Sequence, residues 1–462
     1  MRHDMRKWVS RSLAVMMAFQ AGFSSFPTAS HAAGNGISLI RDAEIEELMR
    51  DYARPIFRVA NIKESAVNVY LINDPGINAF VAGGQRIFLN TGLLVRAKTP
   101  SEVIGVIAHE TGHIAGGHLA RMGKAMDQAS TTAIIGMLLG AAAIVGGAAA
   151  GQGGAAEAGQ GIIAGSQQMA QRNFLAYARA QESAADQAAI SYLNAAKMSG
   201  KGMLDLFQVL ANQSIGSLQN TNRYVMTHPM PFDRIRTLEQ QVKKSPYFAQ
   251  RDSAEFVLRH QLMQAKLVGF MESPQQVYRK YPPSDNSLPG RYARAIAAYR
   301  VGDIQNALPL INGLIETQPR NPYFWELKGQ ALLETGRPAE AISPLQQATE
   351  IKPDAGLIQI LLAQALLGTD NKNFAQSALR VLQQAERHEG SNSQLWRLTA
   401  QAYGKLGDIP RAELATAQAA LLSGDRDLAT QKAKAVLKKF NRGSPEWLRA
   451  NDILNFASKK KG

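Results

Sequence analysis

Apolar residues change their spacing along the chain, and the change predicts the order of the elements. Residues 42–52 carry apolar side chains at helical spacing among acidic ones, and Pro55 ends that pattern, which predicts a first helix. Three short runs rich in Val, Ile, Phe and Tyr follow, separated by turn sequences, at residues 66–72, 77–81 and 86–89. These runs predict the strands of a small sheet. From Ser101 onward the spacing is helical for almost the whole chain.

The last part of the chain repeats. Gly302 and Gly336 lie 34 residues apart between pairs of predicted helices, and Gly407 recurs at the same point of a later repeat. Trp325 and Trp396 stand at equivalent starts. Small residues, which let paired helices approach closely, recur at the expected crossings: Ala295 with Ala307, Gly329 with Ala341, Ala363 with Ala375, and Ala400 with Ala412. The pattern resembles the tetratricopeptide repeat and predicts a superhelix with a concave protein-binding surface.

The N-terminal residues indicate the compartment. Four basic residues precede an uncharged, largely apolar stretch at 13–23, and small residues at 30–32 suit a signal peptidase. We therefore expect a signal peptide at residues 1–32, cleaved near Ala32, and a soluble periplasmic protein of a Gram-negative cell. The alternative is an uncleaved anchor helix, for which the apolar run is short.

Charge and cysteine content narrow the set of partners. The formal net charge is +14, but the basic residues are scattered, and the one tight run is at residues 459–461. This distribution argues against nucleic-acid binding and leaves a peripheral contact with the membrane surface open. The chain has no cysteine, so it has neither a disulfide framework nor a thiol that could accept a lipid.

An uncharged segment of 29 residues lies between Asp127 and Glu157 and consists mainly of Ala and Gly. Its length reaches the roughly 20 residues needed to cross a bilayer, so a membrane span must be considered. Its many glycines and Gln152 weaken that interpretation. We favour a mobile helical hairpin that covers the active site over a membrane-inserted element.

Residues 109–113 read His-Glu-Thr-Gly-His and follow an apolar run that predicts a helix. Positions i and i+4 share a helix face, so His109 and His113 can bind one metal ion while Glu110 takes a proton from a bound water molecule. One Zn²⁺ per chain is expected, because zinc accepts two nitrogens, a carboxylate and water in a tetrahedral site. The motif alone also occurs in unrelated helices.

A second helix supplies the residues that make this interpretation more specific. Glu182 and Asp186 lie four residues apart among many alanines, which would let their helix pack closely against the first. Glu182 can then be the third ligand. Asp186, one turn away, could accept a hydrogen bond from a ligand histidine and fix its tautomer. An ordinary solvated acidic stripe fits these small neighbours poorly.

These two motifs, together with residues 78–80, 83–88, 91–94 and 227–229, resemble the gluzincin peptidases related to the CAAX prenyl protease. The resemblance implies metal ligands at His109, His113 and Glu182, a general base at Glu110 and a supporting catalytic acid at Asp186. It also implies, for a periplasmic member with repeats, that the enzyme degrades unfolded or stalled outer-membrane β-barrel proteins and assists their assembly. The repeats would contact the β-barrel assembly machinery.

Two further histidines have open roles. The resemblance implies that His228 approaches the zinc and holds the enzyme closed; the alternative is that it stabilises the oxyanion or a loop. His118 is expected to support a ligand or to lie at the surface rather than to bind the metal. Residues 85–90 could form an exposed edge strand that pairs with an extended substrate, or a covered strand.

The predicted fold class is mainly α: a zincin-type metallopeptidase domain with a small β-sheet, followed by an α-helical tetratricopeptide-repeat superhelix. The predicted boundaries are 1–32 for the signal peptide, 33–262 for the peptidase domain and 263–462 for the repeats. The expected activity is that of a zinc endopeptidase. Two other classes stay open: a chaperone or scaffold that works through its repeats and has a latent metal site, and an integral membrane peptidase.

Overall fold

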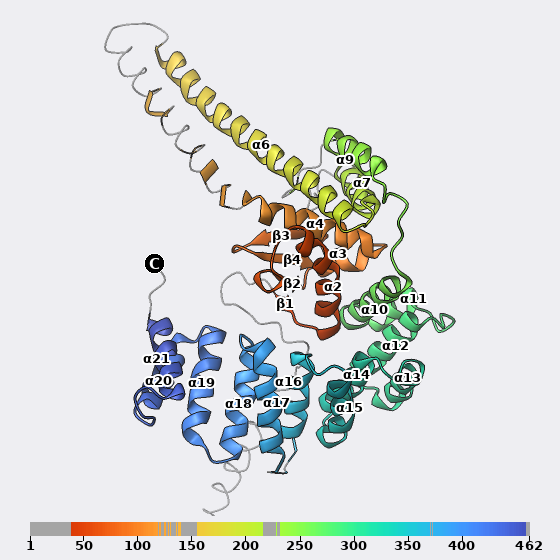
Figure 1. Cartoon of the computed structure of the whole chain (residues 1–462), viewed down its shortest axis with the longest axis vertical. Coiled ribbons are helices and arrows are strands. Elements are labelled where there is room, and N and C mark those ends of the chain that lie inside the picture. Colours follow the sequence, from red (N-terminus) through yellow and green to blue (C-terminus); the bar gives the residue numbers. More distant parts are fainter. Residues whose placement is uncertain are drawn as a thin grey trace, which may run out of the picture. The chain divides into compact units, whose positions relative to one another are not determined.

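A computed structural model describes residues 38–118, 120–121, 124–125, 128, 130, 135, 137–139, 155–215, 228, 232–369, 371 and 373–458. The chain forms two compact units, residues 45–267 and the described parts of 1–44 and 268–462. Figure 1 shows helices throughout both units and one small sheet. The predicted fold class is confirmed.

Three strands of the sheet belong to the unit of residues 45–267. They are β2 (Asn68–Ile72), β3 (Ala79–Ala82) and β4 (Arg86–Asn90), at the positions predicted from their β-branched and aromatic content. β4 lies between the other two, parallel to β2 and antiparallel to β3. The segment considered for an exposed edge is therefore a covered strand, and the edge position belongs to β3. A two-residue strand, β1 (Leu39–Ile40), precedes them in the sequence.

The first helix, α2 (Ala43–Val59), is longer than predicted because Pro55 does not end it. A proline inside a helix removes one backbone hydrogen bond and crowds the preceding turn. Ile56 and Phe57, the next two residues, are buried in the core, and their burial keeps the last turn of α2 in place despite that loss. A 3-10 turn (Glu64–Ala66) then leads into the sheet.

The helix that carries residues 109–113 lies at the centre of this unit. It is α4 (Pro100–Ala115), preceded by the short α3 (Thr91–Arg96). Two glycines let it approach its neighbours closely: a Cβ on Gly105 would lie 2.4 Å from Met203 Cβ of α7 (Lys201–Ile215), and one on Gly112 would lie 2.8 Å from the Ala185 carbonyl oxygen of α6 (Ala155–Ala195). Two further helices complete the unit: α9 (Phe232–Lys244) and α10 (Ala254–Met271), which runs on past residue 267.

His260 of α10 is buried and joins two other segments of this unit. Its Nε2 donates to the Ala97 carbonyl at 2.9 Å, so its Nδ1 accepts from the Tyr52 hydroxyl at 3.2 Å. Burial lowers the pKa of His260 below the value of 6.5 that it has in an unfolded chain. The unfolded state therefore takes up the proton more readily, and the stabilising effect of the neutral ring is present above pH 6.5 and lost as the pH falls below it.

We accordingly expect the unfolding temperature to fall between pH 7.5 and pH 5.5, and this fall to be smaller in His260→Gln, which has no titrating ring. Thermal unfolding followed by circular dichroism at several pH values measures both slopes. Equal pH slopes in the two proteins would show that His260 does not contribute to the acid sensitivity.

The repeat unit consists of paired helices. They are α11 (Pro274–Lys280), α12 (Leu288–Arg300), α13 (Ile304–Thr317), α14 (Pro322–Glu334), α15 (Pro338–Ile351), α16 (Gly356–Leu367), α17 (Asn373–Glu389), α18 (Ser393–Lys405), α19 (Ile409–Ser423), α20 (Arg426–Leu437) and α21 (Pro445–Ser458). Gly302, Gly336 and Gly407 adopt φ near +80° between paired helices, a conformation that side chains with a Cβ rarely adopt. Trp325 and Trp396 each donate a hydrogen bond, 2.8 Å long, to the carbonyl six residues earlier, so the predicted equivalence of the two positions is confirmed.

The last repeats line an open cavity of about 280 Å³ between α17, α18, α19 and α21. Leu379, Leu382, Trp396 and Leu414 supply apolar lining. The Arg449 guanidinium lies 4.9 Å from the Trp396 ring centroid and donates to Glu386. The cavity is therefore lined by both apolar and charged side chains.

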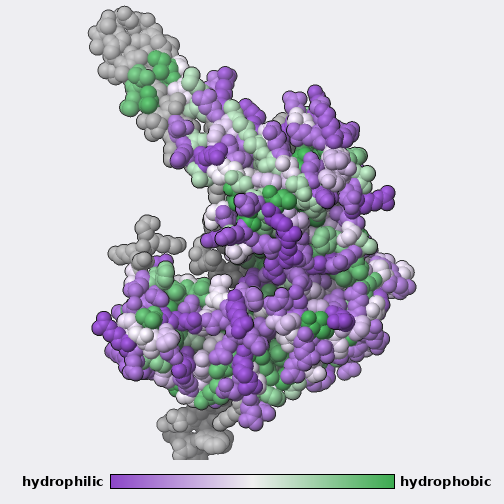
Figure 2. Space-filling view, viewed as in Figure 1, coloured by the Kyte–Doolittle hydropathy of each residue, from purple (hydrophilic) through white to green (hydrophobic). Residues whose placement is uncertain are grey.

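The predicted hairpin at residues 128–156 lies largely outside the described residues, so its covering of the active site stays a prediction. Its described members include the helical residues 135 and 137–139, whose side chains are exposed. The N-terminal half of α6 extends away from the sheet and from α7 and α9, and apolar surface lies near its end (Figures 1 and 2). Among the described residues, no helix is both long and apolar enough to span a bilayer.

Candidate metal centre

Helix α4 presents three of the predicted site residues in one turn. His109 and Glu110 are fully buried, and the side chain of His113 is 13% exposed. Their helical spacing places the Nε2 atoms of His109 and His113 only 3.0 Å apart. The Phe207 ring of α7 packs edge-on against His109 at 5.6 Å and closes the apolar side of the site.

Glu182 reaches this pair from α6, some seventy residues later in the sequence. Its Oε2 lies 3.4 Å from His109 Nε2, and its Oε1 lies 3.4 Å from His113 Nε2. The approach depends on small residues, because the Gly112 backbone of α4 packs directly on Ala185 of α6. The structure thus brings together the three residues that the sequence analysis grouped as ligands.

His228 adds a fourth donor atom to the group. Its Nδ1 lies 3.3 Å from His109 Nε2 and 3.1 Å from Glu182 Oε2. His109, His113, Glu182 and His228 each offer one ligand atom, and these four atoms lie within 4.8 Å of one another. The cluster can hold a metal ion.

The spacing of the donors suits a small tetrahedral cation. Ligand atoms about 2.0–2.1 Å from a zinc ion in a tetrahedral site are about 3.3–3.4 Å from one another. His109 Nε2 lies 3.0–3.4 Å from the donor atoms of His113, His228 and Glu182, and the Glu182 oxygens lie 3.1–3.4 Å from those of the three histidines. Two imidazoles from α4, a third imidazole and a carboxylate are also the ligand types that zinc prefers. The residues present therefore fit the metal.

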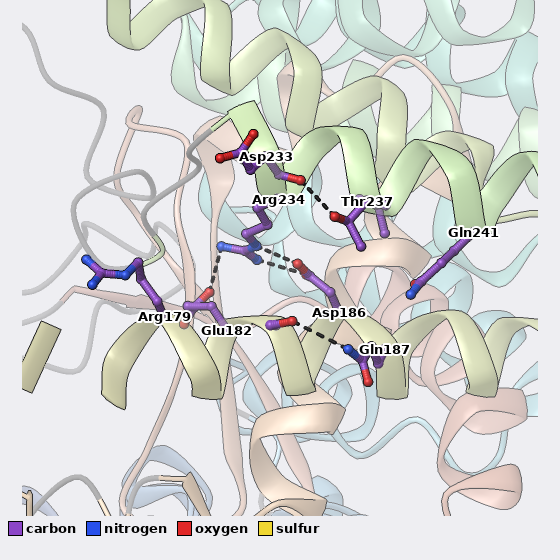
Figure 3. A pocket seen from close by; sticks show the side chains of 10 residues that line it. Arg179, Glu182, Asp186, Gln187, Asp233, Arg234, Thr237 and Gln241 are labelled. Carbon is purple, nitrogen blue, oxygen red and sulfur yellow. Dashed lines mark hydrogen bonds and ion pairs between the residues drawn. The ribbon is translucent and has the colours of Figure 1, made fainter. Parts of the chain in front are cut away.

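Charged residues of α6 and α9 pair with one another beside the cluster, and Figure 3 shows Arg234 reaching both Glu182 and Asp186. Asp186 Oδ1 lies 2.9 Å from His109 Nδ1. Arg234 of α9 contacts Asp186 through Nε and Nη2, and its Nη1 lies 2.9 Å from Glu182 Oε2. Since the side chains of Arg234 and both acids are less than 10% exposed, these ion pairs are protected from solvent screening and fix the positions of the acids.

The charges on these residues favour a cation at the centre. Burial raises the pKa of Asp186 and Glu182, but hydrogen bonds from Arg234 to Asp186 and from His109 and His228 to Glu182 outweigh it and lower both values. Burial, with the nearby charge of His109, lowers the pKa of His113 to about 2, so that ring is neutral. Burial also lowers the pKa of His109, yet its bonds to Asp186 and Glu182 raise the pKa to about 9. The two carboxylates are therefore ionised, and they favour a positive charge on His109, for which a bound metal ion would compete.

Glu110 has surroundings unlike those of the other acids. Both of its carboxyl oxygens are buried, and they accept no hydrogen bond from the part of the chain that the structure describes. His228 Nε2 lies 3.5 Å from Oε1. Burial raises the pKa of Glu110, which the neighbouring histidines lower only in part. A buried carboxylate that accepts no hydrogen bond from the described residues and lies next to a cluster able to hold a metal ion suits a group that exchanges protons during a reaction.

Comparison with known proteins agrees with this geometry. Residues 39–242 match the model of peptidase family M48, and residues 292–356 match a model of the tetratricopeptide repeat. Residues 39–242 form an M48 peptidase domain. The protein is a metallopeptidase with tetratricopeptide repeats, as the resemblance implied.

Relatives of known name cover most of the chain. The beta-barrel assembly-enhancing protease of Yersinia pestis is 24% identical over 406 residues, which are 84% of this chain and 78% of the relative. The protein of the same name from Escherichia coli (strain K12) is 24% identical over 417 residues, which are 88% of this chain and 81% of the relative. The similarity thus extends beyond the M48 domain into the repeats.

The sequence did not predict a role in the site for Arg234, which lies in the M48 domain. The residue stands six positions after His228 at the start of α9, with no motif of its own. Its role depends on the packing of α9 against α6, which the order of residues does not reveal. The charge balance could have indicated it, because two buried acids on one helix face require a buried cation nearby.

The close approach of α4 and α6 in the M48 domain can be tested by a substitution at Gly112. Alanine at Gly112 would place a Cβ 2.8 Å from a backbone oxygen and 3.0 Å from the Cα of Ala185, so α6 must move together with Glu182. A displacement of about 1 Å in a catalytic group can cost about 100-fold in rate, and we expect Gly112→Ala to reduce peptide cleavage by about that factor.

Gly165→Ala is the matched control, because a Cβ at that position of α6 meets no atom within 4 Å. It should cleave at the wild-type rate and unfold at an equal or higher temperature. Wild-type cleavage by Gly112→Ala would contradict the proposed dependence of the site on this contact.

Proposed function

We propose that the protein is an exported zinc-dependent endopeptidase of the periplasm. In this proposal His109, His113 and Glu182 bind Zn²⁺, His228 occupies the fourth position, Glu110 is the general base and Asp186 is the supporting acid. The observation that carries it is the group of four donor atoms within 4.8 Å of one another, with the buried Glu110 next to His109 on the same helix. We also propose a signal peptide at residues 1–32, a peptidase domain at 33–262 and a repeat domain at 263–462.

Each residue of the proposed site has its own chemical role. A bound zinc ion would polarise the scissile carbonyl and lower the pKa of a water molecule toward about 7. Glu110 accepts the proton of that water and returns it to the leaving amine. Asp186 holds His109 Nδ1 and so leaves Nε2 free to bind the metal. Arg234 keeps Glu182 and Asp186 ionised and in place.

The proposed substrates are unfolded or stalled outer-membrane β-barrel proteins, whose assembly the protein would also assist. Support comes from the names of the relatives and from the repeat unit, whose cavity is lined by both apolar and charged side chains. The β-barrel assembly machinery is the second proposed partner. The exposed apolar residues near the end of α6 favour a peripheral contact with the membrane surface.

A second function, that of a non-proteolytic chaperone or scaffold with a latent metal site, is favoured by one observation. His228 stands where a catalytic zinc site keeps a position open for water, and a site with four protein ligands is typical of structural zinc. In this case the repeats would carry the biological activity.

Cells with a defect in β-barrel assembly separate the two functions. They would be supplied with the wild-type protein, with Glu110→Gln, or with neither. If proteolysis is required, the wild type restores assembly and degradation of stalled barrels, and Glu110→Gln does not restore degradation. Full rescue by Glu110→Gln would favour the scaffold.

A further inference from the structure

His118 lies against the proposed ligand His113 on the side away from the donor cluster. The Nδ1 atoms of the two rings are 3.0 Å apart, and the rings meet edge to face with centroids 5.0 Å apart. His118 is 5% exposed. A buried imidazole therefore occupies the hydrogen-bonding position of the outer nitrogen of His113.

The chain has to leave the helix to make this contact. In a continuous helix, residues i and i+5 point about 140° apart, so His118 would face away from His113. Helix α4 ends at Ala115, and Gly117 adopts φ +62°, which turns the chain back. Gly116 leaves space for the ring, because a Cβ there would lie 2.2 Å from His118 Nε2. The two adjacent glycines thus allow the His118 side chain to reach His113.

The direction of the hydrogen bond follows from the role of His113. Its Nε2 faces the cluster, 3.0 Å from His109 Nε2 and 3.4 Å from Glu182 Oε1, and a ring nitrogen that binds a metal carries no proton. The proton of a neutral His113 is then on Nδ1, which donates to His118 Nδ1. His118 in turn carries its proton on Nε2.

We propose that His118 is a positioning residue that fixes the tautomer and ring orientation of His113 for metal binding. This inference rests on the proposed metal site. It completes the outer contacts of the two α4 ligands: His109 Nδ1 lies 2.9 Å from the carboxylate of Asp186, and His113 donates to a neutral imidazole. Such outer partners typically contribute 10- to 100-fold to metal affinity.

Zinc affinity of the full chain, measured by competition with a chelating dye, tests the proposal. We expect His118→Ala to bind zinc about 10- to 100-fold more weakly than the wild type. His118→Asn should recover most of the loss, because its Oδ1 stands close to the position of the imidazole Nδ1 and accepts a hydrogen bond. The unfolding temperatures of the metal-free proteins report separately on the fold.

A double-mutant cycle keeps the test decisive if His118→Ala lowers stability. Gly116 has helical φ and ψ, which alanine also adopts, and the three atoms nearest to an added Cβ all belong to the His118 ring. Gly116→Ala should weaken zinc binding when His118 is present. It should have little further effect when it is added to His118→Ala or to His118→Asn, because both of these variants lack the ring. Equal effects of Gly116→Ala with and without His118 would overturn the proposal.

The remaining outcomes are also distinct. Zinc binding by His118→Ala that is as tight as wild-type binding would overturn the role of His118 and leave the proposed metal site standing. A wild-type chain that binds no zinc would overturn both.

Discussion

Glu110→Gln is expected to reduce peptide hydrolysis by about 10²- to 10⁴-fold while the fold and the bound metal are retained. Glutamine has the shape of glutamate but cannot accept the proton of the attacking water. Glu110 is not one of the four clustered donors, and its buried oxygens accept no hydrogen bond within the described residues, so its replacement leaves the ligands in place. Casein cleavage and zinc content, measured on the same preparations, give both quantities.

Glu102→Gln is the matched control for this prediction. Glu102 is buried on the same helix two turns earlier, and its Oε2 accepts a hydrogen bond from the Lys98 amide, which glutamine can also satisfy. The control should cleave casein at nearly the wild-type rate. Unchanged turnover in Glu110→Gln would remove the proposed mechanism.

His228→Ala should alter the rate of cleavage without emptying the metal site. His228 Nδ1 lies 3.1–3.3 Å from donor atoms of His109 and Glu182, in the place that a catalytic water would need. Removal of this ring leaves three protein ligands and an open position. If the closed arrangement dominates in solution, the rate should rise by about tenfold or more, in proportion to the fraction of closed molecules that is released.

Single-turnover cleavage of unfolded casein, together with zinc content, tests this prediction. His388→Ala, which removes an exposed histidine of α17, is the control and should leave both values unchanged. Equal zinc content and equal rates in His228→Ala and the wild type would refute a regulatory role. A fall in rate with full zinc content would favour the alternative, in which His228 stabilises the oxyanion or a loop.

Much of the site could be predicted from the spacing of residues along helices. Two histidines four residues apart on a helix must share a face, and an alanine-rich helix with two acids at the same spacing can pack against them. The positions of β2, β3 and β4 followed in the same way from β-branched and aromatic runs. The repeats were visible because glycine at fixed intervals marks turns that need positive φ.

Features that depend on tertiary packing could not be predicted from the sequence. The strand order places β4 inside the sheet, and no local pattern distinguishes an inner strand from an edge strand. Pro55 lies within α2 because buried side chains after it keep the helix intact. Arg234 and the contact between His118 and His113 depend on how α9 and the turn after α4 fold back on the cluster.

The central claim is that two imidazoles of α4 and one carboxylate of α6 hold a single zinc ion that catalysis requires. The most direct test is elemental analysis of the full-length protein, purified without added metal, combined with casein cleavage before and after treatment with a chelator. We predict about one zinc ion per chain, loss of cleavage on chelation, recovery on addition of zinc, and loss of the ion in Glu182→Ala. A protein that never retains a divalent ion, or that cleaves casein equally well with the chelator present, would contradict the account.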